Sequence, residues 1–224
     1  MERATRIVAI DGPSGAGKST VAQQVARALG FAYLDTGAMY RAATWWALER
    51  GVDWDDPAGL AACTAALPLE MLEHDGELVV KVDGRDVSEA IRTPEVTREV
   101  YRLDQNPEVR ERLVALQRAF GESQPTVAEG RDIGTVVFPE ARCKIFLDAS
   151  LDERVRRRAA DLHARGIVVD LEALRDEIAE RDRRSRERAV SPLRRADDAI
   201  WVDTTDMTQE EVVARITALA QEAL

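Results

Sequence analysis

The sequence contains few cysteines and no long apolar run. Its 224 residues include two cysteines, Cys63 and Cys143, which form neither a disulfide framework nor the spacing of a metal site. Two reduced thiols in a cytoplasmic protein are therefore expected. No apolar stretch approaches the roughly 20 residues that a membrane-spanning helix needs. The first six residues lead straight into an apolar run, so no signal peptide is expected.

The sequence also lacks a surplus of basic residues. Lysine and arginine number 31 against 41 aspartates and glutamates, which gives a formal net charge of −10. Nucleic-acid binding usually requires a basic face, so a nucleic-acid partner is not expected. The length suits one sizeable domain with insertions, and no repeat or low-complexity linker divides it. No surplus apolar helix stripe calls for a partner, so a monomer is expected.

A stretch near the N-terminus carries the clearest chemical signal. Residues 12–19 fit the phosphate-binding loop pattern G-x-x-x-x-G-K-[ST]. The apolar run 7–10 precedes it and helical apolar spacing follows it, so a strand, the loop and a helix are expected in that order. Lys18 is expected at the β- and γ-phosphates, and the Ser19 hydroxyl can ligate magnesium. A chance glycine-rich turn is the alternative, but it does not account for the flanking strand and helix. The predicted ATP site comprises Gly12, Pro13, Ser14, Gly15, Ala16, Gly17, Lys18, Ser19 and Thr20.

The remaining pattern predicts an α/β fold with a doubly wound, five-stranded parallel sheet, because short apolar runs alternate with helix-like segments. The predicted strands are 7–10, 31–34, 126–129, 144–147 and 199–202. Between residues 69 and 87 the pattern changes to short β-like runs separated by turn signals at 74–76 and 83–84, which predicts a small inserted antiparallel sheet. The predicted helices are 21–29, 38–50, one from Pro94, 107–122, 151–165, 170–188 and one from Thr208.

Arginines recur where phosphoryl transfer needs positive charge. Arg41 and Arg131 follow predicted strands, and Arg110 lies on the helix after the insert. Arg181 and Arg188 are seven residues apart, which predicts a shared helix face. Planar guanidinium groups neutralise phosphoryl oxygens in bidentate fashion, although a solvated surface helix is the alternative for this pair. A solvated, salt-bridged surface is the favoured interpretation for the preceding cluster of Arg154, Arg156, Arg157 and Arg158.

Several longer blocks together resemble bacterial cytidylate kinases. They are residues 10–20, 34–41, 87–92, 129–139, 144–150, 181–182 and 188–193, which span essentially the whole chain. The resemblance implies transfer of the γ-phosphoryl group of ATP to CMP or dCMP, with magnesium. It also implies a nucleoside-monophosphate-binding region over 36–122 and a mobile lid over 151–188. The core would then comprise 1–35, 123–150 and 189–224.

The resemblance also assigns roles around the phosphates. Thr36, Arg41 and Arg131 would hold the acceptor phosphate, and Arg188 would approach the transferring phosphoryl group. No general base is needed, because a phosphate monoester has a second pKa of about 6 and is mostly dianionic at neutral pH. Alignment and charge neutralisation then suffice. The catalytic set implied in this way is Lys18, Arg131, Arg181 and Arg188.

A further set of roles concerns the nucleoside. Arg110 and Asp132 would read the cytosine, and Asp132 can accept a hydrogen bond from the exocyclic amine that uracil lacks. Arg181 would reach the sugar. Two substrate-binding positions depart from the family pattern: Tyr101 stands near the base where a serine is often found, and Ser185 stands where an aspartate usually contacts the sugar.

Two other functions remain as alternatives. One is a related small-molecule kinase acting on another nucleotide or on a sugar, and the block 130–132 with the inserted sheet argues against it. The other is a nucleotide-binding module without catalysis, which the presence of Lys18, Ser19 and many arginines disfavours. The base-reading N-K-x-D pattern of GTPases is absent from the sequence.

Overall fold

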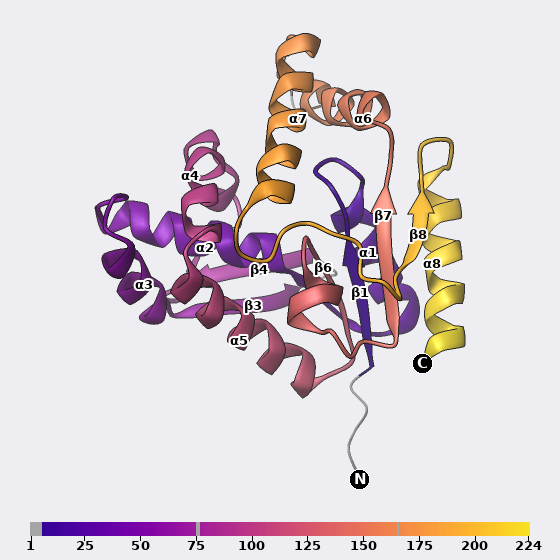
Figure 1. Cartoon of the computed structure of the whole chain (residues 1–224), viewed down its shortest axis with the longest axis horizontal. Coiled ribbons are helices and arrows are strands. Elements are labelled where there is room, and N and C mark those ends of the chain that lie inside the picture. The colour runs from indigo at the N-terminus through magenta and orange to yellow at the C-terminus, as the bar shows by residue number, and fades with distance from the viewer. Residues whose placement is uncertain (1–5, 75–76, 165) are drawn as a thin grey trace. The chain divides into compact units, whose positions relative to one another are not determined.

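The computed structural model describes residues 6–74, 77–164 and 166–224 (Figure 1). The chain divides into two compact units. Unit 1 consists of Met1–Phe31 and Thr126–Leu224, and unit 2 consists of Ala32–Pro125. Within the described ranges, no helix is both long enough and apolar enough to cross a membrane.

The larger of the two described sheets has five strands. Its strands follow the order β2-β6-β1-β7-β8. Strand β1 pairs in parallel with both β6 and β7 (Figure 1). The strands are β1 (Ile7–Asp11), β2 (Ala32–Asp35), β6 (Thr126–Gly130), β7 (Cys143–Asp148) and β8 (Ile200–Asp203). Every residue of β1 and β6 is buried, which explains the apolar run of β1 and the apolar centre of β6 at Val127 and Ala128. The predicted five-stranded parallel sheet is therefore confirmed.

Several helices of unit 1 have capping residues at one or both ends. They are α1 (Lys18–Leu29), α6 (Leu151–Ala164), α7 (Leu171–Glu187) and α8 (Gln209–Ala223). Gly30 ends α1 in the left-handed region, and Thr208 and Glu211 form a capping box at the start of α8. The helices α6 and α7 pack on each other around Val155, Leu174 and Ile178. A π-helical turn, η2 (Ile133–Val137), follows β6 and was not predicted.

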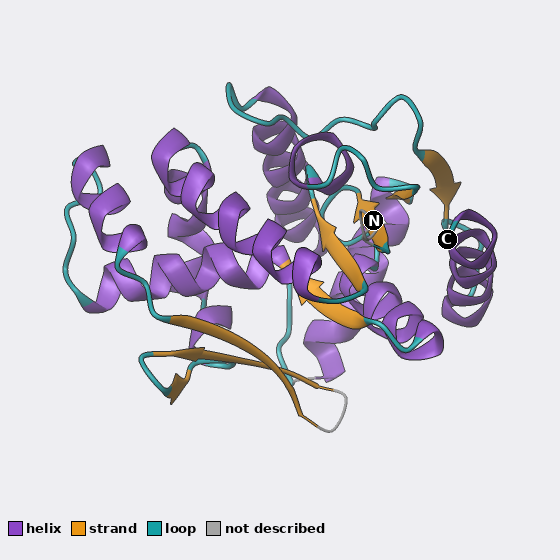
Figure 2. Cartoon of the chain, turned by 90° about the horizontal axis from the view of Figure 1, so that it is seen from below, coloured by secondary structure: helices purple, strands orange, loops and turns teal. Residues whose placement is uncertain are grey.

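Unit 2 contains the predicted antiparallel sheet, with strand order β3-β4-β5 (Figure 2). Its elements are α2 (Thr36–Glu49), α3 (Pro57–Ala65), β3 (Leu69–His74), β4 (Glu77–Val82), β5 (Arg85–Asp86), η1 (Ala90–Arg92), α4 (Pro94–Asp104) and α5 (Pro107–Ser123). The predicted turn between β3 and β4 spans 74–76; His74 is the last residue of β3, and residues 75–76 lie outside the described residues. Trp46 is buried in the core of this unit, and Trp45 packs against that core.

Candidate active site

The phosphate-binding loop connects β1 to α1. Gly12 lies where a Cβ atom would stand 2.0 Å from the carbonyl oxygen of Leu147, so only glycine fits there. Gly17 caps α1 with φ 86, in the left-handed region that glycine favours. The helix begins at Lys18, three residues earlier than predicted. The loop therefore leads directly into a helix N-terminus, which favours bound anions.

Lys18 is buried at the base of this loop. Its ammonium donates a hydrogen bond to the carbonyl of Pro13 at 2.8 Å. Burial lowers the pKa of Lys18, and the nearby positive charge of Arg131 lowers it further; Glu129 and Asp11 oppose these effects. A bound phosphate would add negative charge and favour the protonated amine. The charge of Lys18 can therefore respond to the binding of an anionic ligand.

The side chains of Ser19 and Glu129 place two oxygen atoms that could ligate a metal ion next to each other. The Ser19 hydroxyl donates to Oε1 of Glu129 at 2.6 Å. Glu129 is buried near the end of β6, where it lies opposite Ile10 of β1. Hydroxyl and carboxylate oxygens are ligands that magnesium prefers. Sequence reasoning missed Glu129 as a site residue, although its place directly before the Gly130-Arg131-Asp132 block was a usable signal.

Asp11 anchors the turn that carries Arg131 and Asp132. Its carboxylate accepts hydrogen bonds from the backbone N–H groups of Ile133 at 2.7 Å and Gly134 at 2.8 Å. Burial raises the pKa of Asp11 to about 6, against the lowering effect of these two hydrogen bonds. The negative charge of Asp132 adds to the rise. Sequence reasoning did not single out Asp11, because its partners lie more than 120 residues away.

The turn after β6 brings Asp132 to Arg188. Arg188 Nη2 lies 3.5 Å from Asp132 Oδ1, and both side chains are buried. Arg131 is half-buried and donates to the carbonyl of Gly130 at 3.3 Å. The prediction that Arg181 and Arg188 share a helix face is wrong. The helix α7 ends at Glu187, and Arg188 has φ −59 and ψ 140, so its side chain leaves the helical register.

The cluster of arginines on α6 is not uniformly solvated, contrary to the prediction. Arg154 is buried and donates to the carbonyls of Ala149 and Ser14 and to Asp182. Arg157 is half-buried and donates to Thr204. Apolar spacing cannot reveal such positions, because arginine reads as a surface residue in any periodicity. The prediction holds for the exposed Arg156, which pairs with Glu153, and for the exposed Arg158.

In unit 2, Thr36, Arg41 and Arg110 lie on two helices. Asp35 accepts from the backbone N–H of Ala38 and from Arg41 at 2.9 Å, so it caps α2 and orients this arginine. Because of this cap, α2 begins at Thr36, two residues earlier than predicted. Thr36 is buried in the first turn of α2, and Arg110 is buried on α5.

A ring contact joins α5 to α2. The Arg110 guanidinium carbon lies 5.5 Å from the ring centre of Tyr40, and Arg110 also donates to the carbonyl of Asp104.

Tyr101 is half-buried on α4. In unit 1, Ser185 donates to the carbonyl of Arg181 one turn earlier on α7, and both residues are half-buried.

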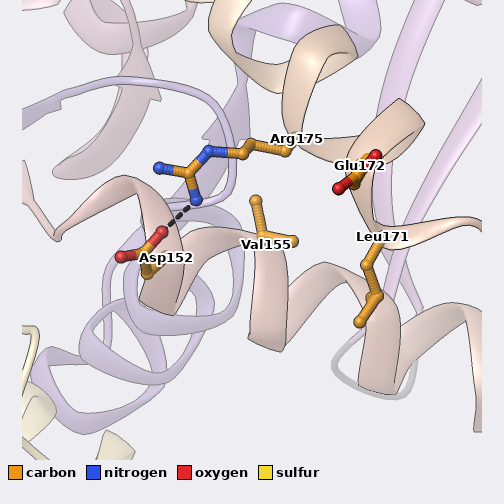
Figure 3. A pocket seen from close by; sticks show the side chains of 5 residues that line it. All are labelled: Asp152, Val155, Leu171, Glu172 and Arg175. Carbon is orange, nitrogen blue, oxygen red and sulfur yellow. Dashed lines mark hydrogen bonds and ion pairs between the residues drawn. The ribbon is translucent and has the colours of Figure 1, made fainter.

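A shallow hollow of about 270 Å³ lies between α6 and α7 (Figure 3). It is lined by Asp152, Val155, Leu171, Glu172 and Arg175, and Asp152 pairs with Arg175 across it. None of these five residues belongs to the predicted site. The hollow lies between residues of the two packed helices.

Comparison with known proteins shows the family of the chain. The family model described as cytidylate kinase matches residues 8–222. A cytidylate kinase of Exiguobacterium sibiricum is 49% identical over 97% of this chain and 97% of that protein. Another, from Geobacillus sp. (strain WCH70), is 48% identical with the same coverage of both chains. The crystal structure of an uncharacterized protein from Eubacterium ventriosum shares the fold, with TM-score 0.51, 14% identity and coverage of 96% of this chain and 98% of that chain. The extent of the sequence match shows that this chain belongs to the cytidylate kinase family.

Proposed function

We propose that this chain is a transferase that moves the γ-phosphoryl group of ATP to CMP or dCMP, giving ADP and CDP or dCDP, in pyrimidine nucleotide metabolism. The observation that carries the proposal is the buried Lys18 at the base of a glycine-rich loop that opens α1. Residues 12–20 hold the phosphates of ATP, with backbone N–H groups and the helix N-terminus as donors.

Magnesium would be held at Ser19 and Glu129. Both supply oxygen ligands, and their side chains already meet at 2.6 Å. Among the described residues, no group of three His, Cys, Asp or Glu side chains is placed to enclose a metal ion. Two protein oxygens suit magnesium, which usually keeps waters and phosphate oxygens in its shell. The ion would neutralise charge on the phosphates.

The acceptor phosphate would be bound by Thr36, Arg41 and Arg131. One of its oxygens forms a bond to the γ-phosphorus while the bond to the β-phosphate oxygen breaks, and ADP leaves with that electron pair. Arg188 stabilises the charge that spreads over the transferring group. The acceptor is already mostly dianionic at neutral pH, so no protein base is required.

The nucleoside would be recognised by a separate set of residues. Asp132 accepts from the cytosine amine, and Arg110 donates to the acceptors of the ring. Arg181 contacts the sugar, with Tyr101 near the base and Ser185 near the sugar. We also propose the division of the chain into a core, a nucleoside-monophosphate-binding region over 36–122 and a lid over 151–188. The packing of α6 on α7 around their own apolar cluster supports a separate lid.

We further propose that the protein acts as a cytoplasmic monomer without nucleic-acid or membrane partners. The net charge of −10 supports the absence of a nucleic-acid partner, because like charges repel a phosphate backbone.

The direct test of the function is ADP release measured with ATP, magnesium and one acceptor at a time. Turnover with CMP and dCMP, and much slower turnover with UMP and AMP, is expected. Equal turnover with all four acceptors would contradict the proposed selection of the cytosine base. ATP binding without ADP release for any acceptor would favour a nucleotide-binding module instead.

A further inference from the structure

The backbone N–H and carbonyl of Ser14, in the phosphate-binding loop, are both bonded to side chains of α6 and α7. Asp182 Oδ1 accepts from the Ser14 N–H at 3.0 Å, and Arg154 Nη1 donates to the Ser14 carbonyl at 2.9 Å. Arg154 and Asp182 also pair with each other at 2.5 Å, with side chains 7% and 5% exposed. Together, Arg154 and Asp182 are called the Ser14 clamp below.

The clamp is itself fixed in place. Arg154 Nε donates to the carbonyl of Ala149, two residues before the start of α6. The backbone of α6 also approaches the loop closely, because a Cβ atom at Gly15 would lie 3.5 Å from the carbonyl oxygen of Arg154. The position of the loop therefore depends on groups that the phosphate-binding pattern does not contain.

Holding two helices together does not require a buried ion pair. Removing two charges from water is costly, and apolar side chains of similar size often stabilise a protein equally well. The helices α6 and α7 already share an apolar cluster and the exposed pair of Asp152 with Arg175 (Figure 3). The particular feature of the Ser14 clamp is that both of its members also bond to the loop.

We infer that Asp182 and Arg154 are positioning residues for ATP, a conclusion that rests on the proposed function of the loop. By fixing the N–H and the carbonyl of Ser14, they hold the loop in the conformation that receives the phosphates. Arg154 also neutralises Asp182, which would otherwise repel the phosphates from a buried position close to the loop.

The test separates stability from ATP binding. The double variant Arg154→Met with Asp182→Leu replaces the clamp by apolar side chains of similar size, so its melting temperature is expected to stay near that of the parent. Its affinity for a non-hydrolysable ATP analogue, measured by calorimetry, is expected to fall at least about tenfold, the scale of losing charge-assisted hydrogen bonds. The KM for CMP at saturating ATP is expected to stay unchanged. Unchanged affinity for the analogue in the folded double variant would overturn the inference.

A second variant keeps the inference testable if the double variant does not fold. Asp182→Asn preserves size and removes the charge, and it is expected to weaken binding of the analogue about threefold or more without changing the KM for CMP. The inference would be contradicted if the affinity for the analogue and the KM for CMP were impaired equally, or if neither changed.

Two further variants serve as references. The double variant Asp152→Asn with Arg175→Gln removes the exposed pair between the same helices and should leave affinity for the analogue unchanged. Lys18→Ala tests the loop itself. If Lys18→Ala leaves turnover intact, the proposed function fails, whereas a strong effect of Lys18→Ala with none from the clamp variants rejects only the clamp.

Discussion

The carboxylate of Asp132 lies 3.5 Å from the guanidinium of Arg188, a residue 56 positions further along the chain, and both side chains are buried. This pair joins the turn after β6 to the residue that follows α7. Asp132 therefore has a cationic neighbour in addition to Arg131, the residue before it in the sequence. An experiment must separate a role of Asp132 in recognising the cytosine base from a role in orienting Arg188.

Asp132→Asn separates these roles. The asparagine amide can donate to the uracil carbonyl, whereas the parent carboxylate faces that carbonyl acceptor to acceptor. A mispaired buried polar contact costs about 1–3 kcal/mol, so the parent is expected to prefer CMP over UMP by at least about tenfold. The variant is expected to narrow the ratio of kcat/KM for CMP and UMP. If activity on both acceptors falls equally and the ratio stays constant, Asp132 serves to orient Arg188 or Arg131 instead.

Lys18→Ala tests the donor site. It removes a buried positive charge next to the loop, and kcat is expected to fall at least about a hundredfold, the scale of losing one preorganised electrostatic donor. Circular dichroism and thermal melting verify that the variant is folded. Lys81→Ala, on β4, is the matched control and should retain turnover. Near-parental turnover in folded Lys18→Ala would contradict the assignment of the loop to ATP.

Glu129→Gln tests the magnesium site. The amide keeps the size of the side chain but loses the negative charge, so the magnesium concentration for half-maximal rate is expected to rise about tenfold or more. Initial rates at fixed ATP over a series of free magnesium concentrations give this value. Glu140→Gln, an exposed position in the same unit, is the control. The same magnesium dependence in both variants would exclude Glu129 from the metal site.

The pH dependence of stability tests the environment of Asp11. Burial raises its pKa from 3.8 to about 6 in the folded protein, so the protonated form favours folding. This contribution is complete below about pH 4 and is lost as the pH rises through about 6, a change on the order of 3 kcal/mol. Asp11→Asn does not titrate, so the parent should lose stability relative to the variant between pH 4 and 7. Urea unfolding of both proteins across this range measures the difference, and a constant difference would contradict the shift.

Hydrogen exchange tests the lid. Binding of a bisubstrate inhibitor is expected to add protection within 151–188, chiefly around the connection between α6 and α7, where Val168 is 88% exposed. The residues next to Arg154 and Asp182 should change least, because their buried contacts to Ser14 already exist. The absence of added protection anywhere in this segment would argue against a closing lid.

Local patterns in the sequence determined the elements of the fold. The apolar run 7–10 predicted β1, and the segment 126–129, with Val127 and Ala128 at its centre, predicted β6, because strands buried on both faces are rich in apolar residues. The glycine-rich loop and the start of a helix at Thr208 could also be predicted from the sequence, because each depends on residues only a few positions apart. The longer sequence blocks gave the family resemblance, which the comparisons bear out.

The tertiary structure alone decided which charged residues are buried and what they bond. Arg154 and Asp182 reach Ser14, more than 130 residues away in the chain, and Asp11 reaches the turn that carries Asp132. Periodicity assigns charged residues to the surface, so it cannot reveal a buried pair whose partners come from different elements. The end of α7 before Arg188 is equally hidden, because a helix face predicted from spacing assumes that the helix continues. These long-range contacts depend on how the strands and helices of unit 1 pack, which local spacing does not encode.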